Sequence, residues 1–388
     1  MIESEPGRHA EPMKVDFAPP SITDVELKAV EAVLRSGWLT TGPVVAELES
    51  ALADYLEAEY VVCLNSATAG IETALAYLEL PRGTPVAIPV WTYISVVQAA
   101  IRCGLQPVLV DVDPATLNLC PSSFARAIES GVKAAVPLHF GGAPYPAEID
   151  RIAANAGVSI VEDAAHAIGG LGHDDRPIAG RSSVAAAFSF YSSKNLTSGE
   201  GGALATSDSG LARFAMSHRL NGIEGGVRNT VGGSVDWDIS TTGIKANLPD
   251  VLAAIALAQL GRIDTMQRQR RALVNHYRTR FAAASCGVEP VPAVQDSRSA
   301  DHLIVVAVPE SIDRAQLQRD LALQGVATSV HFRPVDSLTW SKAMCSVVDG
   351  GTPGAHSIAD RTLSLPLSPE HSLADADYVC DVLFELLS

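Results

Sequence analysis

Helical and strand-like hydrophobic patterns alternate along most of this 388-residue chain. In the helical segments apolar residues recur at three- and four-residue spacing, which is typical of helices with one buried face. Between them lie short apolar runs of the kind found in buried strands. We predict helices at 24–37, 44–58, 66–80, 92–104, 249–281, 314–325 and 375–387. Strands are predicted at 59–65, 85–90, 106–113, 134–140, 159–164, 183–190, 202–208, 302–309 and 327–332.

The order of these elements predicts an α/β fold. Strands that alternate with helices form mostly parallel sheets, because each helix carries the chain back across a face of the sheet. We expect residues 16–250 to form one large domain, a mostly parallel sheet with helices on both faces. Residues 251–388 are expected to form a bridging helix and a smaller α+β C-terminal domain, and residues 1–15 a loose N-terminal arm.

The net charge of −16 and the spacing of the cysteines limit the possible partners. The negative charge argues against nucleic acids and anionic membranes, so an anionic ligand must be bound by local donors. The six cysteines contain no C-x-x-C pair, and we predict neither a metal site nor a disulfide framework. The polar N-terminus lacks a signal segment, and no apolar run is long enough to span a bilayer. We therefore expect a cytoplasmic protein.

Ligands of parallel sheets bind beyond the carboxyl ends of the strands. The segments that follow the predicted strands are therefore the candidates for a functional site. They are 65–70, 91–93, 139–142, 163–166 and 189–195.

Two ionisable side chains, Asp163 and Lys194, follow separate buried strands in this set. Taken alone, Asp163 could cap a helix, and Lys194 could be an ordinary solvated loop residue. Together at one edge of a sheet they suggest a site for pyridoxal phosphate (PLP), whose aldehyde forms a Schiff base with a lysine. The carboxylate would keep the pyridine nitrogen protonated, so that the ring can accept electrons from a carbanion.

A PLP site also needs donors for the phosphate group and a partner for the ring. Ser66, Ala67 and Thr68 open a predicted helix, whose unpaired N–H groups favour a dianion. A plain capping serine is the alternative interpretation. Ser189 could add a hydroxyl group to the phosphate site. Tyr93 could stack on the ring, or it could simply pack at the rim of the sheet.

In their order along the chain, these residues make the sequence similar to the DegT/DnrJ/EryC1/StrS family of PLP-dependent sugar aminotransferases, which have the type I aminotransferase fold. The resemblance extends from about Ser21 to the C-terminus. The stretches that carry it are SGWLTTGPVVAELE, NSATAGIETAL, PVWTYISVVQAA, LVDVDPATLNL, VEDAAHAIGG, FSFYSSKNLTSGEGGALATSD, GIKANLPDVLAAIALAQL, TSVHFRP and LSLPLSP.

The resemblance implies a role for each candidate that would contact the cofactor. Lys194 would form the Schiff base and later move the proton, and Asp163 would pair with the pyridine nitrogen. His166 would lie near the hydroxyl group of the cofactor. The remaining positions are Ser66, Ala67, Thr68 and Ser189 for the phosphate and Tyr93 for the ring face.

The resemblance further implies a homodimer with the active site at the interface. Asn247, and with it Lys245, would then reach the phosphate group of the neighbouring subunit. The loops 38–43 and 331–334 could line the sugar site, or they could serve only in domain packing. The candidate substrate residues are Trp38, Thr40, Thr41, Tyr191 and His331.

The chain departs from the family pattern at a few positions. Ala67 stands where the family often has Gly, and Gly70 where it often has Ala, but neither change removes a backbone donor. Ile244 and Ala246 replace common aromatic residues, which could widen the sugar pocket. Lys194 is retained, whereas dehydratases of the family carry His at this position.

The implied reaction is an amino transfer in two stages, with L-glutamate as the donor and 2-oxoglutarate as its product. A keto sugar attached to a nucleotide diphosphate, such as dTDP or UDP, would then accept the amino group. The G-x-K-x-N form of residues 243–247 and the segment 328–334 favour the C4 position of a 4-keto-6-deoxy sugar. Amination at C3 and an aminocyclitol substrate stay open. Such an enzyme would serve amino-sugar biosynthesis for an antibiotic or a surface glycan.

Two functions of other classes also stay open. A non-catalytic PLP-binding regulator would keep the fold, although the presence of Lys194 and Asp163 argues against it. A nicotinamide-dependent dehydrogenase would need a G-x-G-x-x-G string between a strand and a helix, and the sequence contains none.

Overall fold

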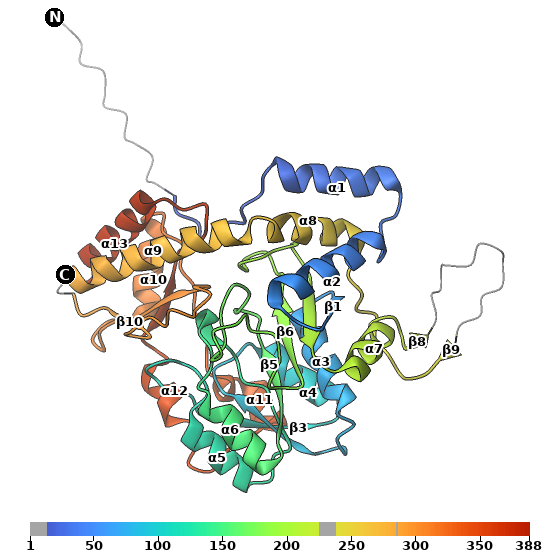
Figure 1. Ribbon diagram of the computed structural model, residues 1–388. Coiled ribbons are helices and arrows are strands. Elements are labelled where there is room, and N and C mark those ends of the chain that lie inside the picture. Colours follow the sequence, from blue (N-terminus) through green and yellow to red (C-terminus); the bar gives the residue numbers. More distant parts are fainter. Residues whose placement is uncertain (1–13, 225–237, 285) are drawn as a thin grey trace, which may run out of the picture.

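The computed structural model describes residues 14–224, 238–284 and 286–388 (Figure 1). Most of the predicted N-terminal arm, residues 1–13, lies outside these described residues. Val15, at the end of that arm, is buried and pairs with Val326 in an isolated β-bridge.

An eight-stranded sheet forms the centre of the molecule, in the order β1-β7-β6-β5-β4-β2-β3-β12. Neighbouring strands are parallel except at β7, which is antiparallel to both β1 and β6. The sheet is therefore mostly parallel, as predicted, and β1, β5 and β6 end at the same edge. The strands are β1 (Tyr60–Leu64), β2 (Pro85–Pro89), β3 (Gln106–Val110), β4 (Ala134–Ala135), β5 (Ser159–Asp163), β6 (Ala185–Ser189), β7 (Gly202–Thr206) and β12 (Ser346–Val347).

Helices cover both faces of this sheet, because successive side chains of each strand point to opposite sides. In β6, Ala185 and Ala187 join the core on one face, and Ala186 and Phe188 join the core on the other. Helices α3, α4 and α7 cover the first face, and α2, α5, α6 and α8 the second, where α1 packs on α8. They are α1 (Asp24–Ser36), α2 (Pro43–Leu56), α3 (Ala67–Tyr77), α4 (Ile94–Arg102), α5 (Pro121–Glu129), α6 (Glu148–Ala156), α7 (Ser209–His218) and α8 (Asp250–Leu260).

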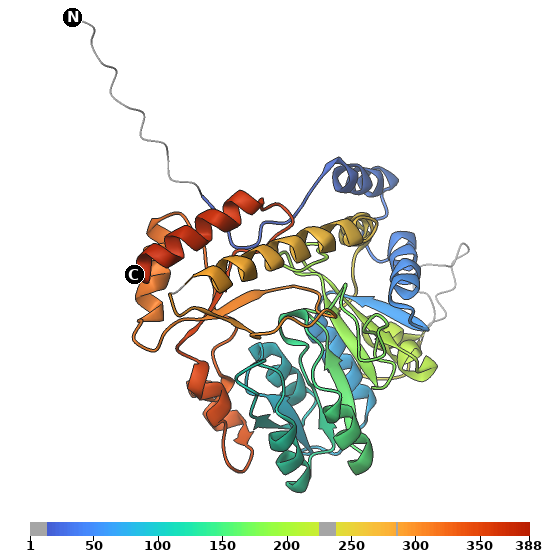
Figure 2. The same cartoon turned by 60° about the vertical axis from the view of Figure 1, so that its left-hand side comes forward.

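A smaller antiparallel sheet, β10-β11-β13, lies in the C-terminal part of the chain. The helices α9, α10 and α13 share a separate hydrophobic core with it, and α9 runs beside α13 (Figure 2). The domain boundary at residue 250 stays a prediction. The elements are β10 (Glu289–Val291), β11 (Ile304–Ala307), β13 (Thr362–Leu365), α9 (Ile263–Ala283), α10 (Arg314–Leu323) and α13 (Leu373–Leu386).

One C-terminal segment returns to the large sheet, because β12 pairs with β3 at its edge. Two short helices, α11 (Thr339–Met344) and α12 (Pro353–Ile358), flank this strand in the sequence. The other short elements are the 3-10 helices η1 (Phe140–Gly142) and η2 (Val335–Ser337) and the paired strands β8 (Ile223–Glu224) and β9 (Asp238–Ile239).

Two predicted elements are shortened or divided in the structure, and a third does not form. Of the strand predicted at 134–140 only Ala134–Ala135 forms, because Pro137 has no N–H group to offer to the ladder. The helix predicted at 249–281 is two helices, α8 and α9, and Pro249 is the cap of α8 rather than its first residue. Helices α5, α6 and α7 were not predicted.

The strand predicted at 327–332 does not form. Ser329 exchanges two backbone hydrogen bonds with Ser364 of β13, at 3.0 and 2.8 Å. The ladder stops at this single bridge, and the chain then turns so that His331 and Phe332 line a cavity beside the large sheet.

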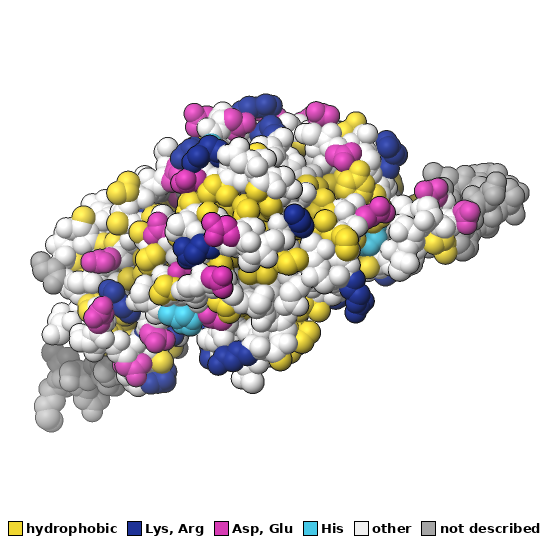
Figure 3. All heavy atoms as spheres, turned by 90° about the horizontal axis from the view of Figure 1, so that it is seen from below, with side chains coloured by type: hydrophobic (Ala, Val, Ile, Leu, Met, Phe, Trp, Pro, Cys, Tyr) yellow, Lys and Arg dark blue, Asp and Glu magenta, His cyan; other side chains and the backbone are white. Residues whose placement is uncertain are grey.

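Charged side chains of both signs are interspersed on the face seen in Figure 3. Figure 3 shows no continuous basic area on that face, which agrees with the net charge of −16. Among the residues described, no helix is both long enough and apolar enough to cross a membrane.

Candidate active site

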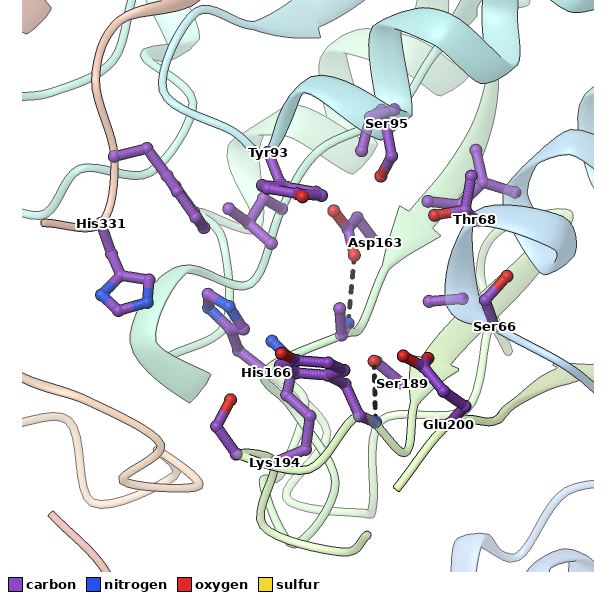
Figure 4. A pocket seen from close by; sticks show the side chains of 18 residues that line it. Ser66, Thr68, Tyr93, Ser95, Asp163, His166, Ser189, Lys194, Glu200 and His331 are labelled. Atoms are coloured by element: carbon purple, nitrogen blue, oxygen red, sulfur yellow. Dashed lines mark hydrogen bonds between the residues drawn. The ribbon is translucent and has the colours of Figure 1, made fainter. Parts of the chain in front are cut away.

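A cavity of about 480 Å³ lies at the edge of the large sheet where β1, β5 and β6 end (Figure 4). Its walls come from the loops that follow these strands, from the start of α3 and α4, and from the segment after β11 and α10. Ten candidates from the sequence line it together: Ser66, Ala67, Thr68, Tyr93, Asp163, His166, Ser189, Tyr191, Lys194 and His331.

Asp163 is the last residue of β5, and its side chain points into the cavity (Figure 4). Only 4% of the residue is exposed. Burial raises the pKa of Asp163, while the N–H group of Ala165, Lys194 and His139 lower it. The Ala165 N–H group donates to Oδ1 at 3.1 Å, which leaves Oδ2 for another partner. A cationic nitrogen in the cavity would therefore stabilise the ionised carboxylate.

Lys194 lies in the tight loop between β6 and β7. The loop is closed by the Lys194 N–H group, which donates to the Tyr191 carbonyl at 2.9 Å. Burial in the cavity lowers the pKa of Lys194 to about 8, although Asp163 raises it. A substantial fraction of this amine is therefore neutral near physiological pH, as a nucleophile or proton acceptor requires.

The N-terminus of α3 forms one wall of the cavity. Ser66 caps the helix, because its hydroxyl group accepts a hydrogen bond from the Ala69 N–H group at 3.1 Å. The N–H groups of Ala67 and Thr68 have no acceptor among the described residues, and both residues line the cavity. Free N–H groups and the helix dipole make this wall suitable for a phosphate group.

Two histidines of the cavity are kept neutral by burial. Burial lowers the pKa of His166 well below its usual range, and Lys194 adds to this effect. For the same two reasons the pKa of His331 falls to about 4. The Gly141 N–H group donates to Nδ1 of His166 at 3.3 Å. His166 therefore carries its hydrogen on Nε2 and can donate from that atom.

Tyr93 stands at the rim of the cavity and is 62% exposed. Its ring centroid lies 6.2 Å from that of Phe332, at an interplanar angle of 47°. The tyrosine is the cap residue of α4, so its backbone is fixed while its ring stays accessible to a ligand.

The cavity also contains residues that the sequence had not singled out by name. Ser193 and Ala165 lie in the candidate segments 189–195 and 163–166. Phe332 lies in the loop 331–334, which the family resemblance had named as a candidate lining of the sugar site, and it does line the cavity. The lining residues outside every candidate segment are Ile71, Ser95, Val96, Leu138 and Glu200.

Five predicted residues do not line this cavity: Trp38, Thr40, Thr41, Lys245 and Asn247. They lie together instead. Asn247 donates to the Thr41 hydroxyl group at 2.7 Å and accepts from Lys245, and Trp38 donates to the Thr41 carbonyl at 3.1 Å. The Thr40 carbonyl accepts from the N–H group of Asp250, the first residue of α8, at 3.2 Å. We call these five residues the Thr41 cluster.

Ile244 and Ala246 also lie outside the cavity. Ala246 is buried in the core under α3, and Ile244 packs against that core. Within one chain, their small size therefore does not enlarge the cavity.

A model of the DegT/DnrJ/EryC1/StrS aminotransferase family matches residues 20–384. The chain belongs to this family. Spr1654 from Streptococcus pneumoniae, solved in PLP and PMP (pyridoxamine phosphate) forms, is 28% identical over 97% of this chain, with a TM-score of 0.87. The match covers 100% of the PLP-form chain and 98% of the PMP-form chain. DesV from S. venezuelae is 30% identical over 94% of each chain, with a TM-score of 0.83. The sugar aminotransferase CalS13 from Micromonospora echinospora is 28% identical, covering 96% of this chain and 99% of its own, with a TM-score of 0.82.

The enzyme is thus a PLP-dependent sugar aminotransferase with the type I fold. Three independent observations indicate that its cavity fits PLP. Lys194 offers an amine of lowered pKa, Asp163 a buried carboxylate that lacks a full cationic partner, and α3 two free N–H groups. When bound, PLP supplies a ring that withdraws electrons from the substrate carbon next to the transferred nitrogen.

Proposed function

We propose that this aminotransferase moves an amino group from L-glutamate to C4 of a 4-keto-6-deoxy sugar carried on a nucleotide diphosphate, dTDP or UDP. The single observation that supports the reaction is the shared cavity of Lys194 and Asp163 in a member of this family. The C4 position is supported by the G-x-K-x-N form of residues 243–247. The enzyme would act in the cytoplasm, in the biosynthesis of an amino sugar for an antibiotic or a surface glycan.

Six residues of the cavity have defined roles in this proposal. The neutral amine of Lys194 would take a proton from the donor carbon that carries the nitrogen and pass it to the cofactor within the same stage. In the second stage it would move a proton in the opposite direction, to the sugar carbon that receives the nitrogen. Asp163 holds the ring nitrogen in its protonated form, and Nε2 of His166 donates to the oxygen on the ring. The N–H groups of Ala67 and Thr68, with the hydroxyl group of Ser189, bind the phosphate group.

The Thr41 cluster belongs, in this proposal, to the cavity of a second subunit. Its five residues are polar or aromatic, and hydrogen bonds join four of them, Trp38, Thr41, Lys245 and Asn247, yet none of the five lines the cavity of its own chain. A symmetric dimer would place each cluster at the open side of the partner's cavity, where Lys245 and Asn247 can reach the phosphate group.

A panel of keto sugars tests the substrate. The enzyme is incubated with L-glutamate and with dTDP-, UDP- and GDP-linked keto sugars, and the products are identified by mass and by NMR. We expect a C4-amino product from a 4-keto-6-deoxy sugar on dTDP or UDP. A product aminated only at C3, or an aminated cyclitol, would overturn the proposed position. If no amino donor changes the absorbance of bound PLP, the non-catalytic regulator is favoured.

Mixed dimers test the shared site. Lys194→Ala and Asn247→Ala each remove one half of it, so each homodimer should be inactive or nearly so. Random reassociation makes about half the dimers mixed, each with one intact site, which restores about a quarter of wild-type activity. Lys194→Ala mixed with the surface variant Lys342→Ala serves as the control, because Lys342 is exposed on α11. If the Lys194→Ala and Asn247→Ala mixture gains nothing, the Thr41 cluster has no role in the partner's cavity.

A further inference from the structure

Asn195, the residue after Lys194, is held in one orientation. It is 4% exposed. Its amide nitrogen donates to the Ala300 carbonyl at 2.6 Å and faces Oε1 of Gln267 at 3.3 Å. Both of these atoms are acceptors, so the nitrogen must be on their side and the amide oxygen on the other.

That amide oxygen lies 3.0 Å from Nδ1 of His302. Because an amide oxygen only accepts, His302 must carry a hydrogen on Nδ1 and donate it to Asn195. His302 is itself 4% exposed, and it does not line the cavity.

The segment that carries His302 is also bonded to the turn after β4. The N–H groups of Ala300 and His302 donate to the carbonyls of Gly142 and Gly141, each at 2.9 Å. Gly141 in turn donates to Nδ1 of His166. The rings of His302 and His166 also pack directly, with centroids 4.4 Å apart.

Gly142 shows how closely these segments approach each other. A Cβ atom at this position would lie 2.9 Å from the Ala300 Cβ and 2.9 Å from the His166 carbonyl. The residue also has a φ of +96°, in the region that favours glycine. The contact between residues 141–142 and 300–302 therefore tolerates no side chain at residue 142.

We propose that His302 is a positioning residue of the aminotransferase, which fixes Lys194 through Asn195 and fixes His166 through ring packing and Gly141. Among the residues described, His302 is the only side chain of this network that contacts both Asn195 and His166. It contacts Asn195 through its Nδ1–H group and His166 through its ring. Its hydrogen bond holds the backbone next to the reactive amine. Its ring keeps Nε2 of His166 directed towards the cavity.

His302 is neutral in this environment. The charged or titratable groups that act on it are His166, Lys194, Arg270 and His331. All of them are cationic when protonated, so they add to the effect of burial, which lowers the pKa of His302 well below its usual range. In the neutral ring the single hydrogen is on Nδ1, where the Asn195 amide oxygen accepts it.

Two substitutions separate the two contacts of His302. His302→Phe keeps a ring beside His166 but cannot donate to Asn195. His302→Asn loses the ring, but its amide nitrogen can take the place of Nδ1 and donate to Asn195. A third variant, Asn195→Ala, removes the acceptor. His276→Asn is the control, because His276 is bonded to Asp377 on the far side of α9 and takes no part in the network.

The first readout is the pH at which Lys194 becomes reactive in the cofactor-free enzyme. An acylating reagent labels the neutral amine, and the labelled peptide is quantified by mass spectrometry over pH 6–11. The second readout is the pH at which the absorbance band of bound PLP titrates. Neither readout needs a sugar or an amino donor, so neither depends on the proposed substrate.

For His302→Phe and Asn195→Ala we expect labelling to begin at higher pH than in the wild type, because a looser loop exposes the amine to water. The absorbance titration should shift in both variants. The double variant should shift no further than either single one, since both remove the same bond. His276→Asn should match the wild type in both readouts. His302→Asn should match it in labelling, because Asn195 keeps a donor, whereas its absorbance titration should shift because the ring packed on His166 is lost. The proposal is overturned if His302→Phe labels like the wild type, if the double variant adds both labelling shifts, if His302→Asn shifts the labelling as much as His302→Phe, or if the absorbance of His302→Asn titrates like that of the wild type.

Discussion

Asp163 and Lys194 face one cavity from the ends of the neighbouring strands β5 and β6, and each stabilises the charge of the other (Figure 4). Burial raises the pKa of Asp163, and Lys194 lowers it. Burial lowers the pKa of Lys194 to about 8, and Asp163 raises it. Removing either residue should therefore change both the chemistry of the site and the ionisation of the one that remains.

The substitution Lys194→Ala should abolish covalent attachment of PLP and reduce turnover about 10³-fold or more, because both the nucleophile and the proton carrier are lost. Borohydride treatment followed by peptide mass spectrometry should find PLP on the peptide containing residue 194 in the wild type only. Lys342→Ala, on the exposed side of α11, should behave like the wild type. Turnover within tenfold of the wild type would show that another residue carries the reaction.

Asp163→Asn keeps the shape of the side chain and its acceptor for the Ala165 N–H group, but it removes the charge. We expect kcat to fall about 10²-fold or more, since the ring nitrogen is no longer held in its protonated form. In the cofactor-free variant Lys194 should become reactive at a lower pH than in the wild type, because Asp163 raises its pKa. The exposed Asp349→Asn is the control. An unchanged kcat, or a shift of Lys194 to higher pH, would contradict this pairing.

Gly202, the first residue of β7, lies against the start of α3. A Cβ atom there would be 2.4 Å from the Ser66 carbonyl carbon and 2.6 Å from the Ala67 nitrogen. Gly202→Ala should therefore lower the free energy of unfolding by about 1–3 kcal/mol and weaken PLP binding, since the helix start must move. In the control Gly261→Ala, the nearest atom would be 3.5 Å away, so stability and PLP affinity should be retained. Urea denaturation and PLP titration measure both effects, and equal behaviour of the two variants would refute the prediction.

His331 should make the cofactor-free enzyme sensitive to acid. Above pH 6.5 the imidazole is neutral in both the folded and the unfolded chain. Between pH 6.5 and about 4 the unfolded chain binds a proton that folded His331 does not, so stability falls as the pH falls. His331→Asn should lose less stability than the wild type over this range, as measured by urea denaturation at pH 7, 5.5 and 4.5.

A control variant and a pH-independent contribution must be considered when this measurement is interpreted. His276→Asn, at the surface, removes a histidine without touching the cavity. His331 also interacts with Ser364, at 2.9 Å, and the loss of this bond lowers stability equally at every pH. The decisive quantity is therefore the slope with pH. A slope in His331→Asn that equals the wild-type slope would exclude His331 as the acid-sensitive group.

The sequence placed the residues of the large sheet well, because each of them follows its own strand directly. Asp163 ends β5 and Lys194 follows β6, so a parallel sheet necessarily brings them to one edge. His302 could not be predicted in this way, and Phe332 was a candidate only through the family resemblance. Both come from segments far along the chain, and their position depends on tertiary contacts such as that between Ala300 and Gly142.

The strand predicted at 327–332 illustrates the same limit. Its apolar residues fit a strand, but they cannot show that the ladder to β13 stops after Ser329. The Thr41 cluster illustrates another. A single sequence does not show how two subunits pack. Residues such as Asn247 can therefore be recognised as candidate site residues, while their contact with the cavity of a second subunit stays a proposal.

The position of β7 in the sheet has a consequence for the choice of cofactor. β7 runs between β1 and β6, so the free N–H groups after β1 and the loop of Lys194 after β6 belong to strands that are not direct neighbours. A ligand that contacts both must therefore extend past the end of β7. An aldehyde without an anionic group at its other end could reach Lys194 but would leave the start of α3 without an acceptor. The order of the strands thereby favours a cofactor whose reactive group and anionic group lie at different ends.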